Sequence, residues 1–260
     1  MGAPDYNQIH VNLATSLVPI KRSKVLVIGC NTGRDCDLFR KAGAPNVCGL
    51  DVVDEIGRDS QMDGITYVQA SAENMPFGNS AFDLVYCFAT MEHVPDIESA
   101  FSEMVRVLAL GGFIYSAASP LWNSPYGHHK PDIFNGYPWI HLTHTRDDIL
   151  DLCRREGIES PNSLPLSDHI DYMLNPLHFN KLPASAYIAT CASLPDVKII
   201  RNDCERLPDD ALPKDIEGKL SQSEINREEC LSVTHTVIAR KPRRSSIQKL
   251  WRRISDPFHQ

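Results

Sequence analysis

The stretch VLVIGCNTGRD, residues 25–35, joins a short β-branched run to a loop with two glycines and then to the start of a helix. The run from Val25 to Ile28 predicts a buried strand, and the loop from Gly29 to Gly33 ends it. Glycine permits a tight turn and lets a ligand approach the backbone, while the first N–H groups of a helix point toward that ligand. Such a loop is a weak signal alone, so the elements that follow it decide the fold.

Strands and helices alternate through the first half of the chain. Apolar runs predict four further strands, at 47–50, 65–69, 82–87 and 113–117. Helical spacing of apolar residues predicts two helices, at 35–42 and 97–108. Strands that alternate with helices form a doubly wound, mostly parallel sheet of the α/β class. Right-handed crossovers then place the loops after successive strands along one edge of the sheet.

The second half of the chain has a different composition. Residues 119–144 are rich in proline, glycine, histidine and aromatic residues. A helix is predicted from Thr145, a suitable N-cap, to Gly157, which would end it. Residues 164–215 carry many prolines and predict an irregular insertion of loops and short pieces over the sheet. A late strand is predicted at 231–239.

The composition is that of an ordinary globular protein. The chain has 260 residues, 42% of them hydrophobic and 23% charged, which excludes a collagen-like, coiled-coil or mostly disordered chain. No apolar run is long enough to span a membrane, and the N-terminal segment lacks the features of a secretory signal. The eight cysteines form no CxxC pair and no zinc-ribbon spacing. They predict free, buried thiols in a reducing cytoplasm.

The net charge of −7 is unevenly spread. Residues 240–260 hold seven Lys or Arg and one Asp, so the remainder is strongly acidic and disfavours binding of nucleic acid. Within the basic tail, 241–260, the segment 246–254 has four apolar residues at helical spacing, Ile247, Leu250, Trp251 and Ile254. This pattern predicts a peripheral contact with an anionic membrane, at the inner membrane surface. The alternatives are contact with a partner, a helix packed on its own domain, and a frayed terminus.

Asp51 ends the second predicted strand, 18 residues after Gly33. A carboxylate at this place can accept two hydrogen bonds from the diol of a ribose. The alternative is an aspartate that only caps a loop.

These motifs, in this order, resemble those of the class I S-adenosylmethionine-dependent methyltransferases. VLVIGCNTGRD resembles their first motif, and GLDVVD the end of their second strand. ASAENMPFGNSAFDLVYCFATMEHV is similar to the stretch from their third strand through the fourth, and SEMVRVLALGGFIYSA to their helix, Gly-Gly and fifth strand. HLTHTRDDILDLCRREGIE resembles the next helix in the broad subgroup that acts on small molecules. The resemblance covers roughly residues 22–160.

The resemblance implies a Rossmann-like methyltransferase domain over residues 1–240, built on a mostly parallel seven-stranded sheet, with 119–144 as a loop on the acceptor side. It implies S-adenosylmethionine as the cofactor. The implied cofactor positions are Gly29, Cys30, Asn31, Gly33, Asp51, Val52, Ser71, Ala72, Glu73, Cys87 and Phe88. Among these, Asp51 would hold the ribose hydroxyls and Val52 would lie against the adenine.

Three positions depart from the pattern of that family. Val27 and Ser71 stand where an acid is usual, and Asn31 stands at the middle glycine. A non-catalytic subunit that binds the cofactor is therefore an alternative. A NAD-dependent dehydrogenase would need a G-x-G-x-x-G loop, which the sequence lacks.

Histidines supply the candidate catalytic bases. His93 follows the fourth predicted strand, and His128 and His129 lie in the loop 119–144. Imidazole is suited to taking a proton from a hydroxyl near neutral pH, and a packing role is the alternative for each ring. No metal site is predicted, because no ligand motif matches the spacing of His128, His129, Asp132, His141 and His144.

The sequence therefore predicts methyl transfer to an oxygen of a small polar acceptor. A sugar or a surface-polysaccharide precursor is the first prediction for that acceptor, because aromatic residues in 119–144 can pack on a sugar ring. A quinone or another lipid is the alternative, which the basic tail would suit.

Overall fold

Strand β1 (Lys24–Ile28) lies inside a seven-stranded sheet in the computed structural model, which describes residues 5–243. Its side chains alternate between two hydrophobic clusters, with Val25 and Val27 in one and the residues that follow each of them in the other. A strand that is covered on both faces is apolar at every position, which accounts for the continuous β-branched run.

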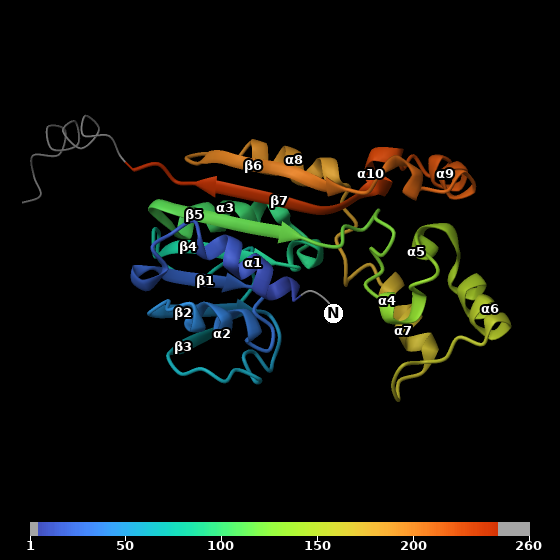
Figure 1. Ribbon diagram of the computed structural model, residues 1–260, viewed down its shortest axis with the longest axis horizontal. Helices are drawn as coiled ribbons and strands as arrows, with labels where there is room; N and C mark the ends of the chain where they lie inside the picture. Colours follow the sequence, from blue (N-terminus) through green and yellow to red (C-terminus); the bar gives the residue numbers. More distant parts are fainter. Residues whose placement is uncertain (1–4, 244–260) are drawn as a thin grey trace, which may run out of the picture.

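The strand order is β3-β2-β1-β4-β5-β7-β6 (Figure 1). The other strands are β2 (Asn46–Asp51), β3 (Ile65–Gln69), β4 (Phe82–Phe88), β5 (Leu108–Ala118), β6 (Lys198–Arg206) and β7 (Ser232–Arg240). The first five strands pair in parallel, and β7 is antiparallel to both of its neighbours. The prediction of a doubly wound, mostly parallel seven-stranded sheet is confirmed.

Helices cover both faces of the sheet (Figure 1). Residues of α1 (Tyr6–Thr15) and α2 (Arg34–Lys41) are buried in the cluster on one face. Residues of α3 (Ile97–Val107) and α8 (Ala184–Ala192) are buried in the cluster on the other face. The short 3-10 turns are η1 (Ile20–Arg22), η2 (Met91–His93) and η3 (Asp209–Ala211).

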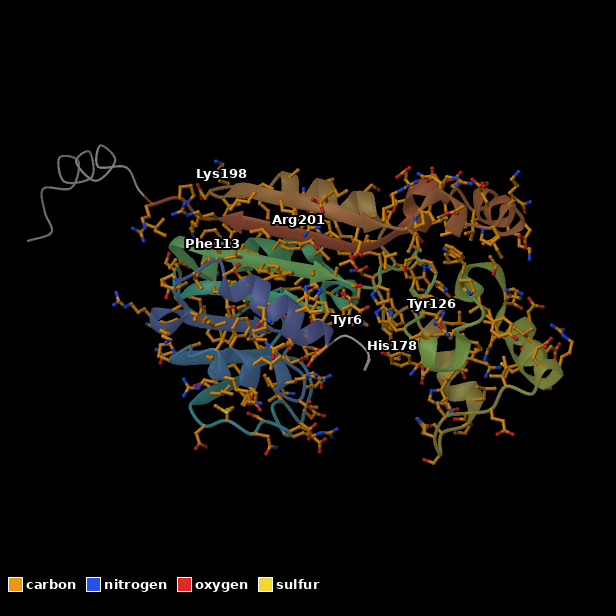
Figure 2. All side chains as sticks on the ribbon, in the orientation of Figure 1. Tyr6, Phe113, Tyr126, His178, Lys198 and Arg201 are labelled. Atoms are coloured by element: carbon orange, nitrogen blue, oxygen red, sulfur yellow. The ribbon has the colours of Figure 1, made fainter. Side chains whose placement is uncertain are left out.

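A group of short helices lies beyond the sheet, off the end at which β5 finishes (Figure 1). We call residues 119–182 the outer lobe. Its helices are α4 (Pro131–Phe134), α5 (Ile140–Thr143), α6 (Arg146–Glu156) and α7 (Leu166–Leu174), and they share a small hydrophobic core of their own. Figure 2 shows Tyr126 and His178 in this lobe, whereas Phe113, Lys198 and Arg201 lie on the strands.

Helix α6 begins and ends as its sequence predicts. Thr145 accepts a hydrogen bond from the backbone N–H of Asp148, whose own side chain completes a capping box. Gly157 ends the helix in the left-handed conformation, with φ of +65°. Two further helices, α9 (Lys214–Ser221) and α10 (Arg227–Leu231), pack around the buried Trp139 of the lobe.

Residues 164–215 are more regular than the sequence predicts, since they contain α7, α8 and the edge strand β6. The prolines there precede helices rather than interrupt them: Pro165, Pro183 and Pro213 stand at the N-caps of α7, α8 and α9. A proline costs little at a helix start, where its missing N–H has no partner to lose. β6 carries mostly exposed, polar residues, so it gives no apolar run.

All eight cysteines are free, and seven of them are buried, as predicted. Among residues 5–243, no helix has both the length and the apolar character needed to cross a membrane. The predicted amphipathic segment 246–254 lies outside the described residues.

Candidate functional site

The loop between β1 and α2 uses left-handed backbone at three positions. Gly29, Asn31 and Gly33 have φ angles of +70°, +44° and +104°. A β-carbon on Gly29 would lie 1.9 Å from Oγ1 of Thr90, so only glycine fits there. Asn31 replaces a glycine because asparagine tolerates this conformation better than most residues. The tight turn is therefore retained.

The carboxylate of Asp51 lies beside this loop. Its Oδ2 accepts a hydrogen bond from the backbone N–H of Asn31 at 2.8 Å, and its Oδ1 accepts one from Val52 at 2.7 Å. Oδ1 also accepts a longer hydrogen bond from the backbone N–H of Val53 at 3.4 Å, so Oδ2 is the oxygen that keeps a lone pair for a ligand. Oδ2 of Asp51 therefore remains able to accept a hydrogen bond from a ligand beside the glycine loop.

A cleft of about 310 Å³ adjoins Asp51. Its lining residues are Asn31, Thr32, Val53, Asp54, Glu55 and Arg58. The chain after β2 is tied back to the glycine loop, because the N–H of Gly57 donates to the carbonyl of Asn31 at 2.8 Å. Val52 is 65% exposed at the start of this segment and offers an apolar surface there.

Ser71 and Glu73, two of the implied cofactor positions, are hydrogen-bonded to each other. The hydroxyl of Ser71 donates to Oε2 of Glu73 at 2.8 Å, and Oε1 of Glu73 accepts from the backbone N–H of Asp96, also at 2.8 Å. Ala72 packs into the core of the sheet. These contacts fix the shape of the loop after β3.

The two predicted positions at the end of β4 differ in access. Cys87 is completely buried, and burial raises the pKa of its thiol, so only its backbone can face a ligand. Phe88 is partly exposed and stacks on His10 of α1, with ring centroids 4.0 Å apart.

Helix α1 lies next to this site and is not among the elements that the sequence predicts. Asn7 donates to the carboxylate of Asp35 at 2.8 Å, and Arg34 forms an ion pair with Asp5, so the start of α1 is fastened to the start of α2. A signal existed, because Asp5 caps the helix by accepting from the N–H of Gln8.

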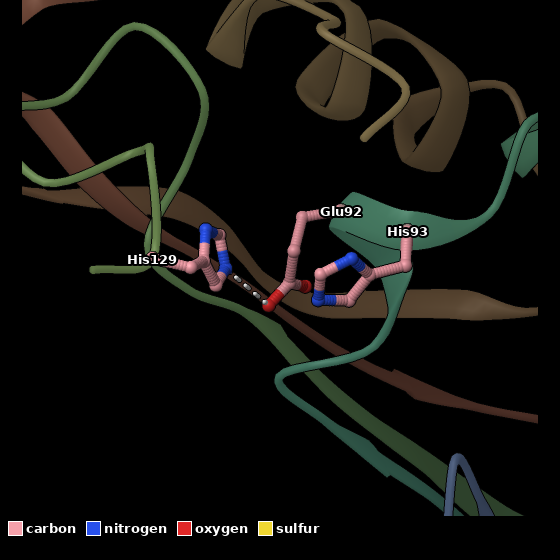
Figure 3. A group of neighbouring side chains, drawn as sticks. All are labelled: Glu92, His93 and His129. Carbon is pink, nitrogen blue, oxygen red and sulfur yellow. Dashed lines mark ion pairs between the residues drawn. The ribbon is translucent and has the colours of Figure 1, made fainter. Parts of the chain in front are cut away.

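Three side chains converge where the end of β4 meets the outer lobe (Figure 3). Glu92 and His93 lie in the turn η2 directly after β4, and His129 lies in the loop after β5. One nitrogen or oxygen of each lies within 4.8 Å of the others, and Nε2 of His129 is 3.7 Å from Oε1 of Glu92. We call these three residues the Glu92 cluster.

Glu92 is only 2% exposed, and neither oxygen of its carboxylate has a hydrogen-bond partner. A buried carboxylate without a partner is strongly unfavourable, since it has lost the water that stabilised its charge. The Glu92 cluster therefore has an unmet requirement for a positive charge or a proton donor.

The hydrogen bonds of the two histidines fix where their protons lie. Nδ1 of His93 is 2.7 Å from the carbonyl of His178, and Nδ1 of His129 is 2.8 Å from the carbonyl of Gly127. A carbonyl only accepts, so each Nδ1 carries the proton and each Nε2 of the neutral ring keeps its lone pair. In Figure 3 both Nε2 atoms are turned toward the carboxylate of Glu92.

Aromatic rings form one wall beside the Glu92 cluster. The ring of Phe179 lies 5.1 Å from that of His93, 4.7 Å from that of His129 and 5.4 Å from that of Trp122. Phe179 was not singled out in the sequence, where it has no neighbouring motif. Phe179 is buried in this wall, whereas Trp122 is partly exposed and can present a flat, apolar face to a ligand.

His128 has a different environment from its neighbour. It is completely buried, its Nδ1 accepts from the backbone N–H of Lys130 at 3.0 Å, and its ring packs against those of Phe134 and His141. Burial lowers the pKa of His128 to about 4. Of the three predicted bases, the structure brings His93 and His129 together, and it places His128 in the packing role.

Residues 26–116 match the family model described as a methyltransferase domain. A sterol 24-C-methyltransferase of Gibberella zeae is 33% identical over 97 residues, which are 34% of this chain and 26% of that protein. A ubiquinone biosynthesis O-methyltransferase of Pseudomonas entomophila is 32% identical over 43% of this chain and 50% of that protein. The chain thus spans about a quarter to a half of the length of the first curated relatives it matches.

Solved structures share the fold at low identity. One is a chain of the Haloferax volcanii complex between the Trm112 methyltransferase activator and a methyltransferase, with a TM-score of 0.53, 15% identity, and coverage of 92% of this chain and 91% of that chain. Another is a chain named as an S-adenosylmethionine-dependent methyltransferase of Listeria monocytogenes, with a TM-score of 0.52, 15% identity, and coverage of 92% and 99%.

Proposed function

We propose that this chain, in which residues 26–116 form a class I S-adenosylmethionine-dependent methyltransferase domain, transfers a methyl group from that cofactor to an oxygen of a small acceptor. The observation that carries this proposal is the presence of two different sites at one edge of the sheet. The glycine loop with Asp51 suits the cofactor, and the Glu92 cluster suits a hydroxyl. Thr90 links them, because it contacts Gly29 and lies two residues before Glu92.

The residues at the first site fit the cofactor. The left-handed turn brings the backbone of the glycine loop close to a ligand, and Oδ2 of Asp51 keeps a lone pair for a ribose hydroxyl. We assign Gly29, Cys30, Asn31 and Gly33 to the methionine part and the ribose. Val52 and the segment from Ser71 to Glu73 are assigned to the adenine, and the end of β4 at Cys87 and Phe88 to the methionine part.

The Glu92 cluster favours oxygen as the acceptor atom. When bound, S-adenosylmethionine supplies a methyl carbon that is already activated by a positively charged sulfur. Transfer would join the acceptor oxygen to this carbon and leave the electron pair of the carbon–sulfur bond on sulfur, so the acceptor hydroxyl would have to lose its proton beside the Glu92 cluster. The cluster presents three groups of lone pairs and so stabilises positive charge, whether from the released proton or from a cation that acidifies the hydroxyl. Positioning of the two reactants supplies much of the rate.

The acceptor that these surroundings suit is a small ring that bears a hydroxyl. The partly exposed Trp122 offers a flat apolar face, and the ubiquinone-pathway relatives are named as O-methyltransferases. A sugar or polysaccharide precursor, the first prediction from the sequence, could stack on the same face, but the relatives reported above carry no such name. We place the activity in the cytoplasm, with membrane contact through 246–254 as a further prediction.

Calorimetry with S-adenosylmethionine and with its demethylated product tests the cofactor assignment. Asp51→Ala should weaken binding by about 1.5–3 kcal/mol, the scale for loss of a hydrogen bond to a charged group, which is about 10- to 150-fold. Asp83→Ala is the matched control, because Asp83 also accepts from a backbone N–H, that of Lys24 at 2.9 Å, but at the other end of β1. The control should bind normally.

Two outcomes would count against these assignments. If neither ligand binds to folded wild-type protein, the cofactor assignment is wrong. If Asp51→Ala binds as tightly as Asp83→Ala, Asp51 does not hold the ribose. Transfer of a labelled methyl group to a catechol, a monophenol and a nucleotide sugar then separates the acceptor classes.

A further inference from the structure

We propose that Glu92, His93 and His129 bind a divalent transition-metal cation at the acceptor side of the site. The binding itself depends only on these three side chains. Its use in catalysis rests on the proposed function, since a cation at this place would lower the pKa of an acceptor hydroxyl.

The first argument is that only acceptors meet in the Glu92 cluster. The Nδ1–H groups of both histidines are committed to backbone carbonyls, so both Nε2 atoms present lone pairs. The carboxylate of Glu92 adds a negative charge and is buried without a hydrogen-bond partner. Two imidazole nitrogens and one carboxylate form a common ligand set for zinc and ferrous iron.

The second argument concerns the alternative occupant, a shared proton. A proton would have to bridge Nε2 of His129 and Oε1 of Glu92, which are 3.7 Å apart and thus too far for a hydrogen bond. Nε2 of His93 would still have no role. A cation about 2.1 Å from each ligand needs ligand atoms about 3.4 Å apart in a tetrahedral site. The observed spacing, within 4.8 Å, needs only small side-chain rotations to reach that value.

The third argument is that the surrounding contacts hold the ligands in place. Histidines that bind metals usually donate their other N–H to a carbonyl or carboxylate, as both do here. The turn that carries Glu92 is held by Asn180, whose side chain donates to the carbonyls of Met91 and Val94 at 2.7 and 2.9 Å. The backbone N–H of Asn180 also donates to the carbonyl of Glu92 at 3.0 Å.

The ligand types select the class of cation. Magnesium and calcium prefer oxygen ligands, whereas imidazole suits zinc, cobalt, nickel and iron. Three protein ligands leave at least one position for an oxygen of the acceptor, as in catalytic zinc sites. We therefore expect Zn²⁺ and Co²⁺ to bind and Mg²⁺ to bind much more weakly.

Titration of the metal-free, full-length protein with Co²⁺, followed by its visible spectrum, tests the proposal, and metal analysis after gel filtration gives the stoichiometry. Wild type should hold one ion per chain. Removing a residue that hydrogen-bonds to a metal ligand typically lowers metal affinity by about 10- to 100-fold. Glu92→Gln, His93→Ala and His129→Ala each change a metal ligand itself, so each should lower Co²⁺ affinity by more than this. His144→Ala, in the same lobe but outside the cluster, should bind like wild type.

The outcomes separate this inference from the proposed function, because the titration needs neither cofactor nor acceptor. Absence of Co²⁺ binding in wild type would overturn the inference, as would equal affinity in wild type and His129→Ala. His129 is a partly exposed loop residue, so the His129→Ala variant is expected to fold. Thermal melting of this variant confirms that it does. Metal binding without binding of S-adenosylmethionine would instead refute the proposed function and leave the metal site standing.

Discussion

The glycine loop and the Glu92 cluster face the same edge of the sheet but are built in different ways. The loop depends on backbone conformation at Gly29, Asn31 and Gly33, and on one fixed carboxylate beside it. The cluster depends on side chains from two separate segments, and its two histidines are each held by a hydrogen bond to a backbone carbonyl. A backbone site tolerates few substitutions, whereas a side-chain site can be changed one ligand at a time. The two sites should therefore respond differently to mutation.

The largest effect is expected at Gly29. Gly29→Ala adds a β-carbon that overlaps Thr90 and forces alanine into left-handed backbone, so the free energy of unfolding should fall by about 2–5 kcal/mol. Denaturant unfolding measures this. Gly78→Ala is the control, because a β-carbon there meets nothing within 4 Å. Adding Thr90→Ala removes Oγ1 and Cγ2 but leaves Cβ 2.6 Å from the added β-carbon, so it should recover only part of the stability that the overlap costs. If the Gly29 and Gly78 variants are equally stable, the glycine loop does not require glycine at position 29.

The Glu92 cluster should show the opposite sign. In metal-free protein Glu92→Gln removes an unpartnered buried charge and supplies N–H donors for the histidine lone pairs, so it should raise stability by about 1–3 kcal/mol. Melting in the presence of a chelator measures this. Glu73→Gln provides the contrast, because both oxygens of Glu73 are hydrogen-bonded and its replacement should destabilise. A lower melting temperature for Glu92→Gln would show that the carboxylate has a stabilising partner.

We expect acid to lower the stability of the outer lobe, because His141 is buried there in its neutral form. Burial lowers the pKa of His141 to about 3, below its ordinary value of 6.5. The unfolded chain therefore binds a proton on this ring more readily, so stability is complete above pH 6.5 and falls as the pH drops from there toward 3. At pH 5 the loss is about 1–2 kcal/mol.

His141→Gln tests this dependence. Its amide can still donate to the carbonyl of Trp122, which now accepts from Nε2 of His141 at 2.7 Å, but it does not titrate. The difference in unfolding free energy between wild type and variant should shrink or reverse between pH 7 and pH 5. A difference that stays constant over this range would mean that His141 is not kept neutral by its burial.

The same contrast explains what the sequence could predict. Strands buried on both faces, such as β1, and helices with local caps, such as α6, carry their signals within a few residues. β6 was missed because an exposed edge strand has no apolar run, and α1 because its burial depends on contacts with α2 and β4. The sequence also could not predict the distances between the side chains of the Glu92 cluster.

His93 and His129 were predicted from their types and places, but only the fold brings them to Glu92. Spacing along the chain gives no metal motif, because 35 residues separate the two histidines. His128 shows that neighbours in the sequence need not share a site. It is adjacent to His129 in sequence, yet the chain turns between them, and His129 adopts left-handed backbone with φ of +57°.

The burial of the cysteine thiols makes their rates of chemical labelling informative. Seven cysteines are protected by packing and none by a covalent bond, so a thiol reagent can reach them only when the chain opens locally. Cys30 lies in the glycine loop, Cys87 in the centre of the sheet and Cys153 in α6 of the outer lobe. The rate at which a thiol reagent labels each cysteine therefore measures how often its own region opens. The unmodified protein thus already contains the probes that would show which region opens first.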